Sequence, residues 1–117
     1  MRLLGDVNNV YVTARNLGLD PVAYLAALPA ARWKRSHLAG HSTNDADGRA
    51  LLIDDHGSPV ALRPCGRLRT RARAASAPSP TLVEWDTELP PLETLLGECP
   101  RQPTRSLMAR DARCGTA

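Results

Sequence analysis

Short apolar runs that end abruptly in polar side chains are the feature of this sequence that most constrains its fold. Residues 50–53 lead directly into Asp54, and residues 81–83 lead in the same way into Glu84. Helical patterns lie between such runs, and strands that alternate with helices favour a parallel sheet of βα units. In such folds the chemistry lies at the carboxyl ends of the strands. The pattern therefore predicts an α/β fold with a polar site at one edge of its sheet.

The other segments are assigned from turn and capping signals. Residues 3–12 read as a strand, a polar turn and more extended chain, and residues 32–41 read as a short strand that enters a loop. A helix is predicted over residues 21–28, because Asp20 can cap it and Pro21 suits its first position. Residues 42–49 are polar and read as loop. A last helix is predicted within residues 90–96, and residues 97–117 read as a disordered tail.

Composition narrows the class of protein. The chain has 117 residues, a formal charge of +3, 43% hydrophobic residues and only 3% aromatic residues, so a large aromatic core is excluded. No apolar run approaches the ~20 residues that span a bilayer, and the polar N-terminus does not resemble a signal peptide, so a cytoplasmic location is expected. Cys65, Cys99 and Cys114 form no CxxC pair, which argues against a disulfide framework or a zinc–thiolate site.

The polar residues that follow the apolar runs are carboxylates, amides and imidazoles. This donor set suits divalent or ferric metals without any thiolate. If the chain is extended at Asp54 and His56, both side chains lie on one face, and Glu84 can bridge two metals through its two oxygens. Each residue also has a plainer interpretation as a turn or capping residue, but four such sites in four successive βα units favour a metal centre. The residues are Asp6, Asn9, His37, His41, Asp54, His56 and Glu84.

These motifs resemble a known family. The segments at residues 6–12, 37–41, 53–57 and 82–87 resemble, in order and spacing, the multinuclear non-heme iron oxidases, formerly domain-of-unknown-function family 692 or uncharacterised protein family 0276. The resemblance covers roughly residues 3–96. It implies a TIM barrel related to xylose isomerase, with two or three irons at its mouth. It also implies that iron and dioxygen modify cysteines of ribosomally made peptides, often with a small partner protein.

The resemblance also assigns roles to residues. Asp6 and Asn9 would be ligands from the fifth strand, His37 would end the sixth, Asp54 and His56 would follow it, and Glu84 would end the eighth. The implied metal ligands are therefore Asp6, Asn9, His37, Asp54, His56 and Glu84. Asn8, His41 and Asp86 would contact metal or substrate, with His41 fitting the HxxGH pattern of the family. Asp55 stands where the family usually has Thr.

Two departures from the family pattern stand out. A whole (β/α)₈ barrel needs ~250 residues, so residues 1–96 are expected to form only its C-terminal half, roughly strands 5 to 8. Residues 61–79 carry alternating arginines in place of an amphipathic helix, with Arg67, Arg69, Arg71 and Arg73 at spacing two. A local frameshift would explain this segment, because the codons of residues 64–67 can spell Val-Trp-Ala out of phase.

The predicted function is iron-dependent oxidation of a peptide cysteine, at a site of which this chain holds only a part. Whether this chain is an enzyme by itself stays open. One alternative is a non-catalytic remnant of a truncated or frameshifted gene, and the missing half could instead be encoded separately. Another is an interaction module whose arginines bind an anionic partner, although the absence of interleaved aromatic residues argues against nucleic acid. A third is a hydrolase or isomerase that uses zinc or manganese in the same barrel.

Overall fold

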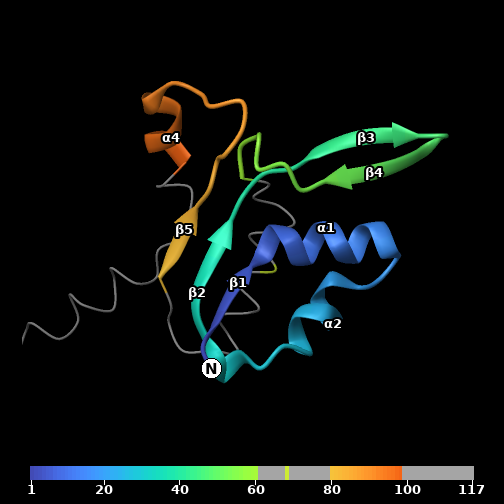
Figure 1. Cartoon of the computed structure of the whole chain (residues 1–117), viewed down its shortest axis with the longest axis vertical. Coiled ribbons are helices and arrows are strands. Elements are labelled where there is room, and N and C mark those ends of the chain that lie inside the picture. Colours follow the sequence, from blue (N-terminus) through green and yellow to red (C-terminus); the bar gives the residue numbers. More distant parts are fainter. Residues whose placement is uncertain (61–67, 69–79, 99–117) are drawn as a thin grey trace, which may run out of the picture.

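Three parallel strands form the sheet on which the rest of the structure is built. The structure, a computed structural model, describes residues 1–60, 68 and 80–98. Strands β1 (Leu3–Asp6), β2 (Trp33–Leu38) and β5 (Thr81–Val83) pair in the order β1-β2-β5. Figure 1 shows the three arrows side by side and pointing the same way. The expected parallel sheet is confirmed, and the carboxyl ends of these strands share one edge.

Helix α1 (Val7–Leu17) begins directly after β1, where the sequence pattern predicts a polar turn followed by extended chain. That prediction is wrong for this segment. Asp6 caps the helix by accepting a hydrogen bond from the Asn9 backbone N–H at 2.9 Å. Val7, Val10 and Ala14 recur at helical spacing and are all buried. Packing of this apolar face therefore outweighs the weak helix propensity of a segment rich in valine and asparagine.

Helix α2 (Pro21–Ala26) confirms the helix that the sequence predicts, although it is two residues shorter. Asp20 accepts a hydrogen bond from the Val22 backbone N–H at 2.9 Å, and Pro21 occupies the first turn. Leu25 is buried, while Val22 and Leu28 pack against the core. A short 3₁₀ helix, η1 (Ala30–Arg32), then leads into β2.

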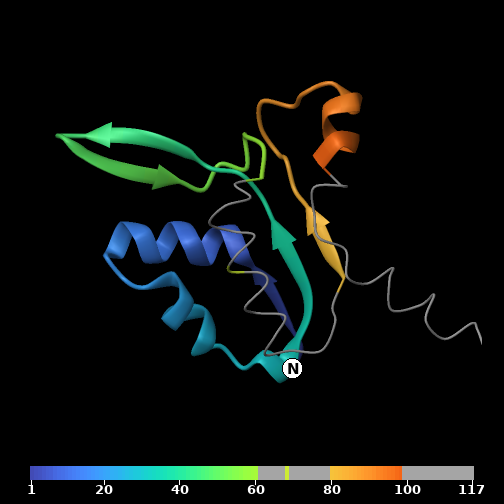
Figure 2. The ribbon, with the colours of Figure 1, turned by 180° about the vertical axis from the view of Figure 1, so that it is seen from behind.

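A β-hairpin replaces the loop that the sequence predicts over residues 42–49. Strand β3 (Ser42–Ala46) pairs with the antiparallel strand β4 (Arg49–Ile53), and the hairpin extends away from the sheet beside α1 (Figure 2). Asp47 and Gly48 have φ values of 54° and 76°, as a tight two-residue hairpin turn requires. Residues 50–53 therefore belong to the hairpin. Within the described residues the parallel sheet has three strands, and the expectation of four successive βα units is wrong.

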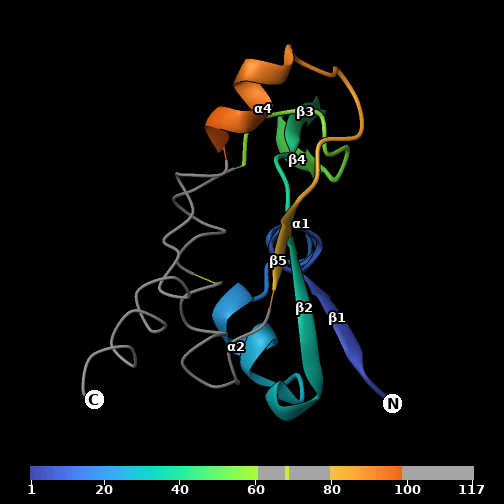
Figure 3. The same cartoon turned by 90° about the vertical axis from the view of Figure 1, so that its left-hand side faces the viewer.

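The last described element is helix α4 (Leu92–Glu98), which confirms the predicted helix. It includes Gly97 and Glu98, so the proposed tail does not begin at residue 97. Figure 3 shows α4 and the hairpin at the same end of the molecule, beyond the carboxyl ends of the strands. The rest of the tail, the three cysteines and the arginines of residues 61–79 lie outside the described residues.

The core lies between the sheet and the two helices α1 and α2. One tryptophan and several aliphatic side chains fill it, as the low aromatic content predicts. Its buried members are Val7, Val10, Leu25, Trp33, Leu38, Val60 and Leu68. Leu4 and Leu82 instead remain 54% and 53% exposed. None of the described helices is long and apolar enough to cross a membrane.

Gly5 allows β1 to pack against the core tryptophan, and this contact yields the first prediction. A Cβ at residue 5 would lie 2.4 Å from the ring of Trp33, which is 4% exposed. We expect Gly5→Ala to lower the free energy of unfolding by about 1–3 kcal/mol, because overpacking forces a buried ring to move. Urea denaturation followed by tryptophan fluorescence measures this change.

Gly97→Ala is the matched control. Gly97 lies in α4, and a Cβ there would meet no atom within 4 Å. The substitution should leave the free energy of unfolding unchanged or raise it by up to about 1 kcal/mol. Equal destabilisation by both substitutions would show that the contact with Trp33 does not matter.

Candidate metal centre

Two carboxylates and an imidazole meet where the three parallel strands end. Asp6 ends β1 and lies opposite His37 of β2 in the sheet register. Glu84 follows β5, and its backbone N–H donates to the Leu38 carbonyl at 2.8 Å, which continues the strand pairing by one residue. The Nδ1 atom of His37 lies 2.5 Å from Oε1 of Glu84. One potential ligand atom from each of Asp6, His37 and Glu84 lies within 4.8 Å of the other two.

His56 brings a second imidazole into contact with four carboxylates. Its Nε2 lies 3.0 Å from Oδ1 of Asp54 and 3.7 Å from Oδ2 of Asp6. Its Nδ1 lies 3.2 Å from Oδ2 of Asp86 and 3.4 Å from Oε2 of Glu84. His56, Glu84 and Asp86 form a second group whose potential ligand atoms lie within 4.8 Å of one another.

Glu84 belongs to both groups, and its two oxygens face different imidazoles. Oε1 faces His37, while Oε2 faces His56. A carboxylate with one oxygen directed to each of two neighbouring sites can bridge two cations. The side chain of Glu84 is 22% exposed, so solvent reaches part of it.

A turn in the backbone, and not an extended strand, brings His56 beside Asp54. His56 has a φ of 49°, in the left-handed region that non-glycine residues rarely adopt. The expectation that both side chains share one face of an extended chain is therefore wrong, although the two do meet. The Asp86 backbone N–H donates to the His56 carbonyl at 2.8 Å, and the Thr87 hydroxyl donates to the Asp55 carbonyl at 2.9 Å. These bonds hold the turn against the segment that follows β5.

The carboxylate of Asp55 serves the turn itself. It accepts hydrogen bonds from the Gly57 backbone N–H at 3.2 Å and from the Ser42 hydroxyl. The bond from Ser42 is the main cause that lowers the pKa of Asp55. Within the described residues, Asp55 belongs to neither ligand group.

Two side chains of α1 hold the carboxylate of Asp54 from the other side. Asn8, which is completely buried, donates to Oδ1 through its Nδ2. Asn9 donates to Oδ2 through its own Nδ2 at 3.0 Å. Asn9 also contributes the backbone N–H that Asp6 accepts. The first turn of α1 therefore orients both of these aspartates.

His41 contacts Asn8 on the side away from Asp54. Its Nδ1 is 2.9 Å from Oδ1 of Asn8, and its ring centroid is 5.3 Å from that of Tyr11. Burial lowers the pKa of His41, although the charges of Asp54 and Asp55 act in the opposite direction. Within the described residues, His41 belongs to neither ligand group.

His56 shows the opposite pKa shift. Burial disfavours its protonated form, but the carboxylates of Asp54 and Asp6, together with the charge and hydrogen bond of Asp86, outweigh that effect. The pKa of His56 is therefore raised above its ordinary value of 6.5. In the metal-free chain, a proton on His56 offsets part of the negative charge of the cluster.

The structure thus brings most of the predicted site residues together, although not all of them lie in the two potential ligand groups. Asp6, His37, His56, Glu84 and Asp86 supply the two groups, and Asp54 and Asn9 lie against them. Asn8 and His41 form a layer behind Asp54. The sequence pattern does not predict the contact of Tyr11 with His41, because it indicates a turn and extended chain over residues 7–12, where α1 begins. A helix over those residues places Tyr11 one turn after Asn8, so the helical spacing of valines was the available signal.

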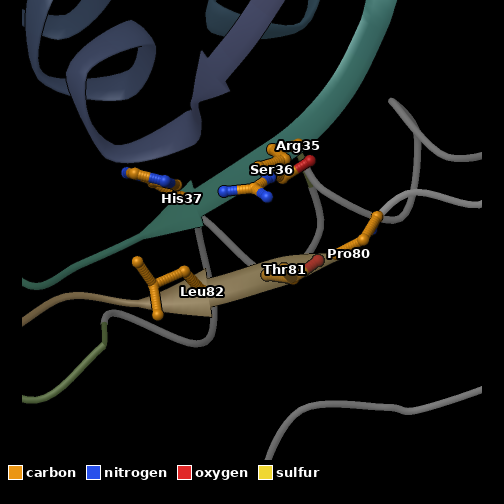
Figure 4. A pocket seen from close by; sticks show the side chains of 6 residues that line it. All are labelled: Arg35, Ser36, His37, Pro80, Thr81 and Leu82. Atoms are coloured by element: carbon orange, nitrogen blue, oxygen red, sulfur yellow. The ribbon is translucent and has the colours of Figure 1, made fainter.

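A shallow pocket lies beside the first group, and Figure 4 shows its lining residues on the neighbouring strands β2 and β5. His37 belongs to both the pocket and the metal group. The Thr81 hydroxyl is buried and, among the residues that the structure describes, meets no hydrogen-bond partner. The pocket is lined by Arg35, Ser36, His37, Pro80, Thr81 and Leu82.

The donor set defines what this centre can do. Imidazole nitrogens and carboxylate oxygens suit iron, manganese and zinc. Two groups that share one carboxylate suit a pair of neighbouring cations, and paired metals can polarise or oxidise a common substrate. The geometry is therefore that of a candidate multinuclear metal centre.

Comparison with known proteins identifies the family of the chain. The family model "RiPP precursor modification enzyme MbnB/TglH/ChrH" matches residues 1–105, where RiPP denotes a ribosomally synthesised and post-translationally modified peptide. No solved structure matches the chain.

Curated relatives match most of the chain. A UPF0276 protein of Pseudomonas aeruginosa is 48% identical over 100 residues, which cover 86% of this chain and 34% of the relative. UPF0276 proteins of Caulobacter vibrioides and Bordetella bronchiseptica are 49% and 50% identical, over 82% and 85% of this chain and 34% of each relative. The chain thus spans about a third of the length of these relatives. It belongs to the MbnB/TglH/ChrH family of RiPP precursor modification enzymes.

Proposed function

We propose that this chain contributes part of a metal-dependent site that modifies a ribosomally made peptide. In this proposal, residues 1–96 form the C-terminal half of a xylose isomerase-like TIM barrel, and the mouth of the complete barrel holds two or three irons. The substrate is a peptide cysteine that dioxygen oxidises, and a small partner protein takes part. The family match supports the peptide substrate, while iron, the barrel and cysteine oxidation rest on the resemblance described above.

The position of Glu84 between two imidazoles is the observation that carries the proposal. His37 and Asp6 would complete one metal site, and His56 and Asp86 would complete the other. When bound, iron supplies the one-electron chemistry through which dioxygen can oxidise a thiol. The protein's own contribution is to fix the ligands, and the bonds from Asn8 and Asn9 to Asp54 do this for the carboxylate beside His56.

The strand arrangement supports the barrel. Consecutive parallel strands that lie side by side, with polar residues at their carboxyl ends, are the repeating pattern of (β/α) barrels. The pocket beside His37 offers the peptide a place to bind on the face that carries Arg35 and Leu82. Because the chain spans about a third of the length of its relatives, the proposed barrel and the proposed activity are those of a full-length protein of this family.

Hydrolysis or isomerisation with zinc or manganese is a second candidate, because the donor set accommodates these metals equally well. Aerobic and anaerobic incubation with a cysteine-containing precursor peptide separates the two. Oxygen consumption and a mass change at cysteine support the oxidase. Conversion that is independent of oxygen supports the second candidate.

Glu84→Ala tests the shared carboxylate. We expect the full chain, loaded with ferrous iron without oxygen, to retain about two iron ions as measured by elemental analysis after gel filtration. Glu84→Ala should weaken retention of both ions by at least about 10-fold, since loss of a ligand should cost no less than loss of its hydrogen-bond partner.

Glu93→Ala is the control for this experiment. It removes an exposed carboxylate of α4 and should leave the iron content unchanged. Iron binding by the native chain that survives Glu84→Ala would contradict the shared site. A native chain that binds no metal would favour the non-catalytic remnant.

The raised pKa of His56 yields a pH prediction for the metal-free chain. The folded state binds this proton more tightly than the unfolded state, so its stabilising effect is full below pH 6.5 and is lost as pH rises through the raised pKa. NMR titration of the ring C–H signals should place His56 above 6.5. Asp54→Asn should lower this pKa, because it removes a charge that raises it. Asp47→Asn, in the hairpin turn, should not change it; an unchanged pKa in Asp54→Asn would contradict the assignment.

A further inference from the structure

We infer that Asn8 and His41 act as a positioning pair that fixes the Asp54 carboxylate. This inference deepens the proposed function and rests on it where metal affinity is the readout. It gives Asn8 and His41 a role other than the metal or substrate contact that the sequence resemblance implies.

Asn8 is placed where its amide orientation is determined by its partners. It is completely buried, and its Nδ2 donates to the Gly40 carbonyl at 3.0 Å and to Oδ1 of Asp54. A carbonyl and an ionised carboxylate can only accept hydrogen bonds. The NH₂ group of Asn8 must therefore face these two oxygens, because the flipped amide would set its own oxygen against both of them.

This orientation fixes the proton on His41. The Oδ1 atom of Asn8 faces Nδ1 of His41 at 2.9 Å, and an amide oxygen can only accept. His41 must therefore donate from Nδ1, and its neutral form is the Nδ1–H tautomer. An imidazole whose Nδ1–H is held by an oxygen acts as an anchor for that oxygen. His41 thus holds Asn8, and Asn8 holds Asp54.

The backbone around the pair makes this arrangement rigid. A Cβ at residue 40 would lie 2.2 Å from the Ser58 carbonyl oxygen, so the chain approaches closely at Gly40 and places the carbonyl that Asn8 contacts. The Ser58 hydroxyl donates to the His41 carbonyl at 3.1 Å. The ring of Tyr11 lies beside the ring of His41. Asn8 and Tyr11 both lie on α1, so one helix face carries both contacts.

The consequence concerns Asp54. One of its oxygens contacts His56 at 3.0 Å and also accepts from Asn8, while the other accepts from Asn9. Partners behind a ligand orient it, and their loss typically lowers metal affinity by about 10–100-fold. The pair would therefore act on the metal centre through the carboxylate beside His56.

The tautomer is tested in the metal-free full chain by long-range ¹H–¹⁵N NMR of the histidine rings. We expect Nδ1 of His41 to show the protonated resonance and Nε2 the unprotonated one. Asn8→Ala should abolish this preference. A native His41 that is protonated only at Nε2 would overturn the inference, whether or not the chain binds metal.

Two substitutions of His41 then separate positioning from ligation. Asparagine places its amide nitrogen where Nδ1 of histidine lies, while glutamine reaches the position of Nε2. We expect His41→Asn to keep the affinity for Co²⁺ within about threefold and His41→Gln and Asn8→Ala to lower it by about 10–100-fold. The reverse order of the two His41 variants would show that His41 binds metal through Nε2.

Titration with Co²⁺, followed by its visible absorption, measures these affinities, and circular dichroism establishes that each variant folds. If the native chain binds no Co²⁺ but His41 carries the Nδ1 proton, the proposed function fails while the Asn8–His41 pairing stands. If metal binds and the tautomer is wrong, the pairing fails while the metal centre stands.

Discussion

The parallel pairing of β1, β2 and β5 is the constraint on which the rest of the structure depends. The register that aligns Asp6 with His37, and the bond from Glu84 to the Leu38 carbonyl, place one polar side chain at the end of each strand. A slip of one residue in β2 would turn His37 toward the core and Leu38 away from it, since neighbouring side chains alternate between faces. Burial of Leu38 and Trp33 against the helices therefore also determines where the candidate ligands lie.

Negative charge is concentrated where this register ends. Asp6, Asp54, Glu84 and Asp86 surround His56 at contact distances, and such carboxylates repel one another unless a cation lies among them. In the metal-free chain that cation is the His56 proton, which explains the direction of its pKa. A divalent metal would supply more charge at the same place, and it requires the imidazole to release its proton. The pKa shift and the proposed metal binding thus have the same physical origin.

The sequence predicted what depends on local chemistry and missed what depends on tertiary packing. Asp20 and Pro21 specify the start of α2 through a cap and a fixed φ, and the structure has both. Helix α1 was missed because its valines and asparagines favour other conformations, and burial of Val7 and Val10 together with the Asp6 cap stabilises the helix. The hairpin did carry a local signal, since Asp47-Gly48 is typical of two-residue turns, but its polar β3 lacked an apolar alternation.

The candidate site divides along the same line. That His37 and Glu84 would meet could be inferred, because the ends of parallel strands share an edge. The meeting of His56 with Asp54 could be inferred too. The left-handed backbone of His56 could not, since it depends on bonds from residues 30 and 32 positions later in the chain. The contacts of Asn8 could not be predicted for a further reason. Its side chain points to the correct partners only if α1 is helical, so one misassigned element concealed the layer behind Asp54.

The face of the sheet opposite α1 and α2 fits the barrel proposed above. Leu4 and Leu82 lie exposed on either side of β2, next to the pocket that contains Arg35 and His37. Exposed leucines cost free energy in proportion to their apolar area, and in a closed barrel this face would be the packed interior. The relatives are about three times as long as the matched segment. In the proposed barrel, closure would bury both leucines and leave the candidate metal ligands accessible only from the mouth, where His56 and Glu84 lie.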